Sequence, residues 1–482
     1  MRRKAKRPRM PRRAWLPVGP SLGSPLLTLC VIARDEEERL EACLASAARV
    51  VDDIVVVDTG STDRTREIAR NLGARVLEVP WRENFSAPRN AGLDAARGRW
   101  VLFLDADERL DPVQGQELKR RLLRAEVPAF TVEIVSPLGS GEEEVAHVTR
   151  LVRSLHGIRF EGRIHESVLP SVCRLLGVDT WTPPRSGLRI HHEGYLPEVR
   201  AARAKHERNR RLLLAEIESR PGEPGPRFLY ARENTPRAGA DLLDLPGARR
   251  SRDILEPAVR VLAGLPARGI TDPALFLASR LHLVTGDPDR AAGLAREHLR
   301  LVGRTARWCW AAGERELLRG DPRRAAALFR EARTAPEGSE NLPAEGWIRH
   351  GGSLVREALA LYLAGRPGEA ASLLARVRPG VEPLLVRAFV RASREGPAAA
   401  VPVLGEAVSA APADPRCWWA LSAALALAGD RERAADAAAT ARRAAPGWAA
   451  VPEQGPVDPA RAPAGLLAAL ARLAAPAPAL AG

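Results

Sequence analysis

The strongest constraint on the fold is a regular alternation of apolar runs and helical patterns between residues 26 and 105. Four runs of strand length alternate with three segments whose apolar residues recur at helical spacing. The predicted strands are 26–33, 53–58, 74–80 and 99–105. This alternation with short connections predicts a parallel, doubly wound α/β sheet. In such sheets ligands bind beyond the carboxyl ends of the strands.

After about residue 235 the pattern changes to helices alone. Four stretches share a helical run, a glycine turn and a charged helix start, and their turn glycines are Gly286, Gly320, Gly365 and Gly429. The first two glycines are 34 residues apart, which is the tetratricopeptide period, and the later intervals are wider. We therefore expect an α-solenoid in which each helical hairpin covers the apolar face of its neighbour.

These patterns predict a chain of four parts. A basic tail covers 1–25, an α/β domain 26–235, a helical repeat domain 250–450, and an Ala/Pro-rich tail 451–482. Pro- and Gly-rich stretches over 221–250 mark the boundary between the two domains. Between these stretches, the segment 227–234 is expected to form the first helix of the solenoid. In the α/β part, Ser86 and Gly98 are the expected caps of a helix over 86–98.

The net charge of +14 does not by itself indicate a nucleic-acid-binding protein. Basic residues are almost all Arg, aromatic residues make up 4% of the chain, and many charges lie in the basic tail. The five scattered cysteines form no CxxC pair, which indicates free thiols in a reducing compartment. No apolar stretch reaches the roughly eighteen residues of a membrane span. We expect a cytoplasmic protein without a nucleic-acid partner, and the basic tail leaves peripheral contact with a membrane surface open.

Three acids follow the predicted strand at 99–105 in the sequence "FLDADERL". Asp105, Asp107 and Glu108 repel one another unless a cation lies among them. Two acids separated by one residue at a strand end can hold Mg²⁺ or Mn²⁺ together with a nucleotide diphosphate. Of the three, Glu108 is expected to point away from the ligand and to tolerate substitution.

The order "VVDTGSTD", then "RN", then "DADE" resembles the family 2 glycosyltransferases of the GT-A fold, over roughly residues 26–235. Together with the helical repeats, the chain is most similar to the bacterial subgroup that carries tetratricopeptide repeats behind the catalytic domain. The resemblance implies a Rossmann-like GT-A domain that binds a nucleotide-diphosphate sugar. It also implies Mg²⁺ or Mn²⁺ as cofactor.

The resemblance also implies which residues bind the nucleotide sugar. These are Ala33, Arg34, Glu36, Asp58, Thr59, Arg89, Asn90 and Asp105. Many relatives have a second acid at the position of Thr59, so the choice of base is not implied. Asp107 resembles the metal ligand of the family. His192 resembles the histidine that completes the metal's coordination, with His191 as the alternative.

A catalytic base is expected in the segment 157–168, which alternates apolar and polar residues as a half-buried strand does. An inverting transfer needs a carboxylate that takes the proton of the acceptor hydroxyl. By its position after the DxD motif, which is Asp105 and Asp107 in this chain, Glu166 resembles the family's base, and Glu161 is the competitor. In a regular strand His165 faces away from Glu166, which makes His165 structural.

The leading hypothesis is an inverting, metal-dependent glycosyltransferase of glycan, cell-envelope or protein glycosylation. Its helical repeats would bind a protein, peptide or glycan acceptor. The alternative is a catalytically inactive GT-A domain on a scaffold for protein–protein interaction. Partner binding that survives the loss of Asp107, with no donor turned over, would favour the scaffold.

Overall fold

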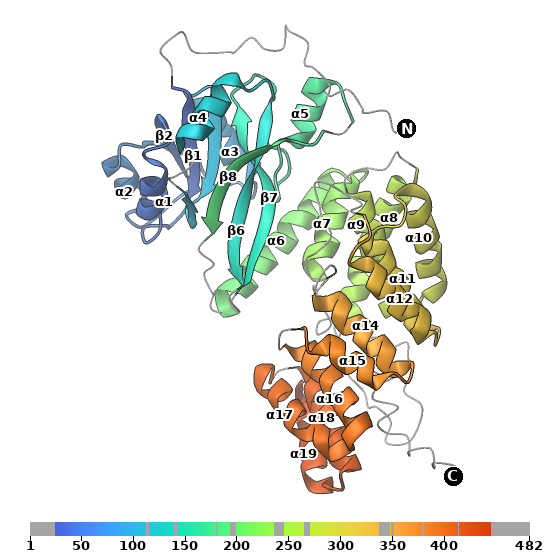
Figure 1. Ribbon diagram of the computed structural model, residues 1–482. Helices are drawn as coiled ribbons and strands as arrows, with labels where there is room; N and C mark the ends of the chain where they lie inside the picture. The colour runs from blue at the N-terminus through green and yellow to red at the C-terminus, as the bar shows by residue number, and fades with distance from the viewer. Residues whose placement is uncertain are drawn as a thin grey trace. The chain divides into compact units, whose positions relative to one another are not determined.

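The computed structural model describes residues 25–111, 115–138, 142–179, 181–192, 199–235, 245–264, 270–336, 348, 351–377, 380–412 and 414–444. Apart from Pro25, the two tails predicted from the sequence lie outside these residues. The chain divides into two compact units between Ser219 and Arg220, and each is described by itself (Figure 1).

The first unit is built on an eight-stranded sheet with helices on both faces (Figure 1). Its strands are β1 (Leu27–Ala33), β2 (Asp53–Asp58), β3 (Arg75–Glu78), β4 (Trp100–Asp105), β5 (Glu108–Leu110), β6 (Ala129–Leu138), β7 (Glu142–Arg153) and β8 (Arg185–His192). Its helices are α1 (Leu40–Ala47), α2 (Thr65–Asn71), α3 (Ser86–Ala95), α4 (Gly115–Arg124), α5 (Leu169–Leu176) and α6 (Val199–Ser219).

The sheet is mixed rather than wholly parallel. Its order is β3-β2-β1-β4-β7-β6-β8-β5. The four strands predicted from the alternation pair in parallel, which confirms that half of the sheet. Strand β7 is antiparallel to β4 and β6, and β5 is antiparallel to β8. Beyond the four predicted strands, β6 and β8 also pair in parallel, and a long antiparallel hairpin, β6–β7, makes the sheet mixed.

Strand β4 is apolar throughout because both of its faces are covered. Trp100, Leu102 and Leu104 face a core that includes α1 and α4, whereas Val101 and Phe103 face one that includes α3 and α5. All five side chains are fully buried. The apolar run ends where the strand leaves these two layers, at Asp105.

Helix α3 begins and ends differently from the prediction. Asn84 supplies the cap, because its Oδ1 accepts hydrogen bonds from the backbone N–H groups of Ser86 (2.8 Å) and Ala87 (3.3 Å). Ser86 lies inside the helix and donates its hydroxyl to the carbonyl of Gly162. The helix ends at Ala95, before Gly98. A Cβ at Gly98 would lie 2.6 Å from the backbone nitrogen of Thr28, so this glycine allows close approach to β1.

The second unit is helical over the residues that the structure describes. Its α-helices are α7 (Pro224–Asn234), α8 (Leu245–Ala263), α9 (Thr271–Val284), α10 (Pro288–Leu301), α11 (Ala306–Leu318), α12 (Pro322–Ala332), α14 (Gly351–Leu363), α15 (Pro367–Leu374), α16 (Val381–Glu395), α17 (Val401–Ala410), α18 (Pro415–Leu427) and α19 (Arg431–Ala444). Helix α7, which contains the segment expected to begin the solenoid, packs against α8 and α9. The predicted domain boundary at residue 235 would leave this helix in the first domain, whereas it lies in the second unit.

The four predicted hairpins are present, each with its glycine in the turn. Gly286, Gly320, Gly365 and Gly429 have φ of 86°, 80°, 80° and 92°, a region that favours glycine. After the first two turns, Asp287 and Asp321 cap the next helix by accepting a hydrogen bond from a backbone N–H three residues on. The prediction of helical hairpins is therefore confirmed. Among the described residues no helix combines the length and the apolar character needed to cross a bilayer.

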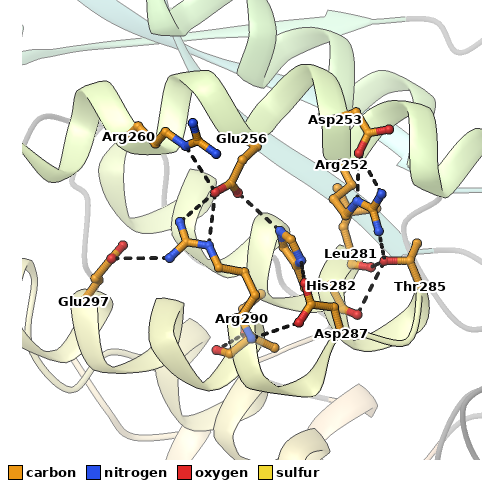
Figure 2. A network of polar contacts seen from close by, with 12 residues as sticks. Arg252, Asp253, Glu256, Arg260, Leu281, His282, Thr285, Asp287, Arg290 and Glu297 are labelled. Atoms are coloured by element: carbon orange, nitrogen blue, oxygen red, sulfur yellow. Dashed lines mark hydrogen bonds and ion pairs between the residues drawn. The ribbon is translucent and has the colours of Figure 1, made fainter.

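Polar networks join successive hairpins of this unit. Around Glu256, Arg290 Nη2 lies 2.8 Å from Oε1 and His282 Nε2 lies 3.2 Å from Oε2, so α8, α9 and α10 are tied together (Figure 2). His282 Nδ1 also lies 3.1 Å from Asp287 Oδ2. These groups line a concavity of about 740 Å³ whose charged side chains largely pair with one another.

A second network is fully buried at the start of α9. Asp272 Oδ1 lies 2.7 Å from His298 Nε2 and accepts a hydrogen bond from Thr305 Oγ1 at 2.8 Å. The guanidinium of Arg307 pairs with the other carboxylate oxygen. Burial alone would raise the pKa of Asp272, but the His298 hydrogen bond and the Arg307 charge lower it below its usual value.

Substitution of Asp272 by Asn is expected to lower the unfolding free energy of the helical unit by about 3 kcal/mol, because the buried Arg307 and His298 lose the carboxylate charge that they contact. The folded-state pKa of Asp272 is lowered, so its contribution is present above about pH 4 and is lost as the pH falls further. Urea unfolding should show a larger difference between wild type and variant at pH 7 than at pH 3. Asp253→Asn is the control, since that side chain is 64% exposed. Equal stability of wild type and Asp272→Asn at pH 7 would contradict the prediction.

Candidate active site

Strands β2, β1 and β4 end at the same edge of the sheet because they run parallel. Ala33 pairs with Asp58 in the register of β1 and β2, and Ile32 pairs with Asp105 in that of β1 and β4. Asp58 and Asp105 therefore lie at one edge of the sheet, the edge at which ligands bind in parallel α/β sheets.

The turn after β2 is held by its own side chains. Asp58 is buried, and its Oδ2 accepts hydrogen bonds at 3.1 Å from the N–H groups of Gly60 and Ser61. Thr59 is also buried, and its Oγ1 donates to the carbonyl of Ala33 at 3.3 Å. Gly60 has a φ of 110°, which favours glycine. Both side chains shape the turn, and the nucleotide contact predicted for them stays a prediction.

The loop after β1 is hydrogen-bonded to this turn and carries an exposed guanidinium, that of Arg34. Asp35 Oδ1 accepts a hydrogen bond from the N–H of Thr62 at 2.7 Å. Arg34 is 56% exposed and lies 3.7 Å from Asp35. Glu36 is half-buried and accepts a hydrogen bond from Arg39 at 3.2 Å. Of the nucleotide-binding side chains predicted in this loop, Arg34 is therefore the accessible one.

Asp105 is held by two arginines. Arg89 Nη2 lies 3.0 Å from its Oδ1, and Arg150 donates to Oδ1 at 3.2 Å and to Oδ2 at 2.6 Å. Burial alone would raise the pKa of Asp105, but the charges and hydrogen bonds of Arg150 and Arg89 hold it well below its usual range. The carboxylate is therefore ionised, and its side chain is still 40% exposed at the edge.

Arg150 was missed by sequence reasoning, and its position explains why. The pairing of β6 with β7 shifts between Phe130 and Thr131, which face Leu151 and Thr149. Arg150 is the extra residue of this bulge on β7. A bulge breaks the alternation of faces and redirects a side chain, often beside an active site. Here it directs a guanidinium at Asp105.

Glu108 is buried and structural, contrary to the expectation that it points away and tolerates change. Its side chain is 2% exposed, and Oε2 accepts a hydrogen bond from the Asp105 N–H at 2.8 Å. Its Oε1 lies 3.4 Å from Arg150. Burial raises the pKa of Glu108, although Arg150 opposes this. The acid fixes the backbone at the start of the DxD motif.

Substitution of Glu108 by Ala is therefore expected to lower the free energy of unfolding by about 2–3 kcal/mol. It leaves the buried N–H of Asp105 without a partner and removes a carboxylate beside Arg150. Thermal unfolding measures the effect. In the exposed control Glu117→Ala, the change should stay below about 0.5 kcal/mol. An equally small loss of stability in both variants would show that Glu108 tolerates substitution, as expected from the sequence.

Asp107 and His192 meet at the same edge because β5 pairs with β8. In the register, Glu108 faces His192, which brings His192 beside the turn that carries Asp107. Its Nε2 lies 3.2 Å from Asp107 Oδ2, and both side chains are about one-third exposed. The hydrogen bond that His192 donates to the Asp107 carboxylate raises the pKa of His192. Burial would raise the pKa of Asp107, but His192 lowers it.

The geometry separates the two histidine alternatives. Exposed and buried positions alternate along β8. His191 occupies an exposed position, whereas His192 occupies the next, partly buried one. The Asp107–His192 pair combines an oxygen and a nitrogen ligand with solvent access. Among the described residues no group of three or more His, Cys, Asp or Glu is arranged to hold a metal. A cation held here would take its remaining ligands from a diphosphate and water, as Mg²⁺ does in nucleotide sites. The two side chains fit such a cation.

The segment 157–168 is a loop rather than the predicted strand. Gly157 and Gly162 have positive φ, as does His165 at 52°, and pairing is confined to a bridge between Glu161 and Ser167. Face alternation therefore cannot assign His165, although it is exposed.

The two candidate bases in this loop have different partners. The Glu166 carboxylate pairs with Arg89, and its side chain is 10% exposed. Glu161 pairs with Arg174 of α5. Glu166 is thus joined through one arginine to Asp105, whereas Glu161 pairs outside this group.

Arg89 and Asn90 of α3 have partners other than those predicted. Arg89 is 7% exposed, and its guanidinium holds Glu166 and Asp105. The Asn90 amide donates to the carbonyl of Phe160 at 3.0 Å and accepts from its N–H at 2.8 Å. Asn90 therefore fixes the loop backbone, and its contact with the nucleotide stays a prediction.

Comparison with known proteins places this edge within a family. Residues 28–174 match the family described as "Glycosyl transferase family 2". The matched segment runs from β1 into α5 and includes Asp105, Asp107 and Glu166. This part of the chain is therefore similar to the domain that defines the family 2 glycosyltransferases.

Two curated relatives are similar over about half of their length. The TPR repeat-containing protein Synpcc7942_0270 of Synechococcus elongatus is 38% identical over 201 residues, which are 40% of this chain and 49% of that protein. The SPbeta prophage-derived glycosyltransferase SunS of Bacillus subtilis is 27% identical over 219 residues, 44% of this chain and 49% of SunS. Among solved structures, S. aureus TarS 1-349 in complex with UDP-GlcNAc matches 57% of this chain and 91% of its own, with 16% identity and a TM-score of 0.37.

Proposed function

We propose that this protein transfers a sugar from a nucleotide-diphosphate sugar to an acceptor nucleophile, with inversion at the anomeric carbon and with Mg²⁺ or Mn²⁺. The observation that carries the proposal is the meeting of four acidic and basic groups at one sheet edge: Asp107, His192, Asp105 and Glu166. The family match, which covers Asp105, Asp107 and Glu166 and ends before His192, supports the proposal, as does the glycosyltransferase named among the relatives.

The residues divide into a donor side and an acceptor side. Asp105 keeps part of its carboxylate accessible and can accept a hydrogen bond from a donor hydroxyl. Asp107 and His192 would hold the cation. A bound Mg²⁺ or Mn²⁺ stabilises the negative charge that develops on the departing diphosphate. Arg34, exposed on the loop after β1, is available to the diphosphate or the ribose.

Glu166 performs the proton transfer. Its carboxylate takes the proton of the acceptor hydroxyl while the acceptor oxygen forms a bond to the anomeric carbon. The bond from that carbon to the diphosphate oxygen breaks on the opposite face, and the nucleoside diphosphate leaves with the electron pair. Attack from the opposite face inverts the configuration.

The helical repeats are proposed to bind the acceptor, a protein, peptide or glycan, or a partner of the assembly. Stacked hairpins form extended surfaces suited to such ligands. The repeats named in one relative support an interaction role of this kind.

The test is turnover of a panel of UDP-, GDP- and dTDP-sugars by the full chain, with Mn²⁺, with Mg²⁺ and with EDTA. Release of nucleoside diphosphate to water reports donor cleavage even without the acceptor, and NMR of the released sugar reports its anomeric configuration. We expect one nucleotide class to be cleaved, in the presence of metal, with inversion. If no donor is cleaved and none binds, the proposal fails and the scaffold alternative is favoured.

A further inference from the structure

We infer that Arg89 is a positioning residue that fixes the acceptor-side carboxylate, Glu166, relative to the donor-side carboxylate, Asp105. This inference rests on the proposed function and gives the buried arginine a role other than contact with the donor. Arg89 Nε pairs with Glu166, and its Nη2 lies 3.0 Å from Asp105 Oδ1. The guanidinium is a rigid planar fork, so one side chain sets the distance and orientation between two carboxylates.

The packing of Arg89 holds this fork in place. Its guanidinium carbon lies 5.8 Å from the ring centre of Phe103 and 5.6 Å from that of Phe160. The two rings contact each other edge to face, with centres 4.8 Å apart. Phe103 belongs to β4, the strand that ends in Asp105, and Phe160 belongs to the loop that carries Glu166. Arg89 is therefore clamped between the two segments whose carboxylates it binds.

The neighbouring residue strengthens the same link. Asn90 binds the backbone of Phe160 through both ends of its amide. Ser86, one turn earlier on α3, donates to the carbonyl of Gly162. Helix α3 thus contacts the loop through Ser86, Arg89, Asn90 and Asp94, and of these contacts only that of Arg89 continues to Asp105.

The charges explain why the link is an arginine. Asp105 and Glu166 are both acids, and bringing them together without a cation would raise the energy of the ionised pair. Arg150 compensates Asp105 from the other side but pairs with Glu108 rather than Glu166. Arg89 alone among these residues bonds both the donor-side and the acceptor-side acid, so Arg150 is its matched control.

The test combines Arg89→Lys with Glu166→Gln in a double-mutant cycle. Lysine keeps the charge but loses the fork, so Glu166 should shift. We expect donor cleavage, measured as kcat, to fall about 10²-fold in Arg89→Lys, as for misplacement of a reacting group by about 1 Å. The Kd of the nucleoside diphosphate with Mn²⁺ should change by less than about threefold. In the Glu166→Gln background, Arg89→Lys should change kcat by less than about threefold, because the base it positions is gone.

Arg150→Lys should behave differently, since its effect persists in the Glu166→Gln background. Two results would overturn the inference while leaving the proposed function intact: Arg89→Lys weakening nucleotide binding as much as it slows turnover, or an undiminished Arg89→Lys effect in the Glu166→Gln background. If wild type cleaves no donor, the proposed function fails, and thermal unfolding of the same four proteins still decides the link. If the melting-temperature shifts of Arg89→Lys and Glu166→Gln add up to that of the double variant, the link is refuted. A shift of the double variant that is smaller than this sum would support the link.

Discussion

Substitution of Asp107 by Ala is expected to reduce donor cleavage by about 10³-fold, with the remaining activity insensitive to Mn²⁺. The reason is that Asp107 would supply the carboxylate ligand of the cation, and His192 alone is a weak site for Mg²⁺ or Mn²⁺. Loss of several kcal/mol of charge stabilisation on the leaving diphosphate corresponds to a factor of this size. The measurement is initial-rate release of nucleoside diphosphate over a Mn²⁺ titration.

Asp94→Ala is the control for this variant. Asp94 lies on α3 and pairs with Arg159, and its side chain is 59% exposed, so its loss should leave the rate within about twofold. His192→Ala should change the metal dependence in the same direction as Asp107→Ala. Full activity of Asp107→Ala at low Mn²⁺ would show that the DxD motif does not hold the cation.

Substitution of Glu166 by Gln is expected to lower turnover by about 10²–10⁴-fold, because Gln keeps the shape of the side chain but cannot accept a proton. The affinity for nucleoside diphosphate and Mn²⁺ should be unchanged, since Glu166 lies on the acceptor side. Steady-state kinetics together with calorimetric binding separates the two effects.

Glu161→Gln is the matched variant, because it lies in the same loop and is also paired with an arginine. It should retain most of the turnover. A large loss in Glu161→Gln with little change in Glu166→Gln would reverse the assignment of the base. It would also remove the reason for the Arg89 link, which joins Asp105 to Glu166 only.

The parts of the fold that follow from local pattern were predictable from the sequence. Strand β4 reads as an apolar run because cores cover both faces, and Asp105 marks its end. The repeat turns were predictable because a positive φ selects glycine, as at Gly286 and Gly320. The mixed half of the sheet was not, because a long hairpin such as β6–β7 carries no strand–helix alternation.

The site was predictable where a strand end fixes the residue and unpredictable where tertiary contacts do. Asp105 and Asp107 follow directly from β4. Arg150 contacts Asp105 because of a β-bulge, and no pattern in the sequence predicts this bulge. From the sequence, Glu108 is expected to point away from the ligand and Arg89 to bind the nucleotide sugar, but partners from distant segments bury both side chains. A buried charge is recognised by its counter-charge, and that pairing is a property of the fold.

The central claim is that the edge at the end of β4 binds a nucleoside diphosphate through a cation held by Asp107 and His192. Electron paramagnetic resonance of Mn²⁺ with the full chain tests this claim most directly, in the absence and presence of UDP, GDP and dTDP. We predict that one of these diphosphates increases the fraction of bound Mn²⁺ in wild type, and that Asp107→Ala weakens this binding by more than about tenfold. Equal Mn²⁺ binding by wild type and Asp107→Ala in the presence of every diphosphate would contradict the account.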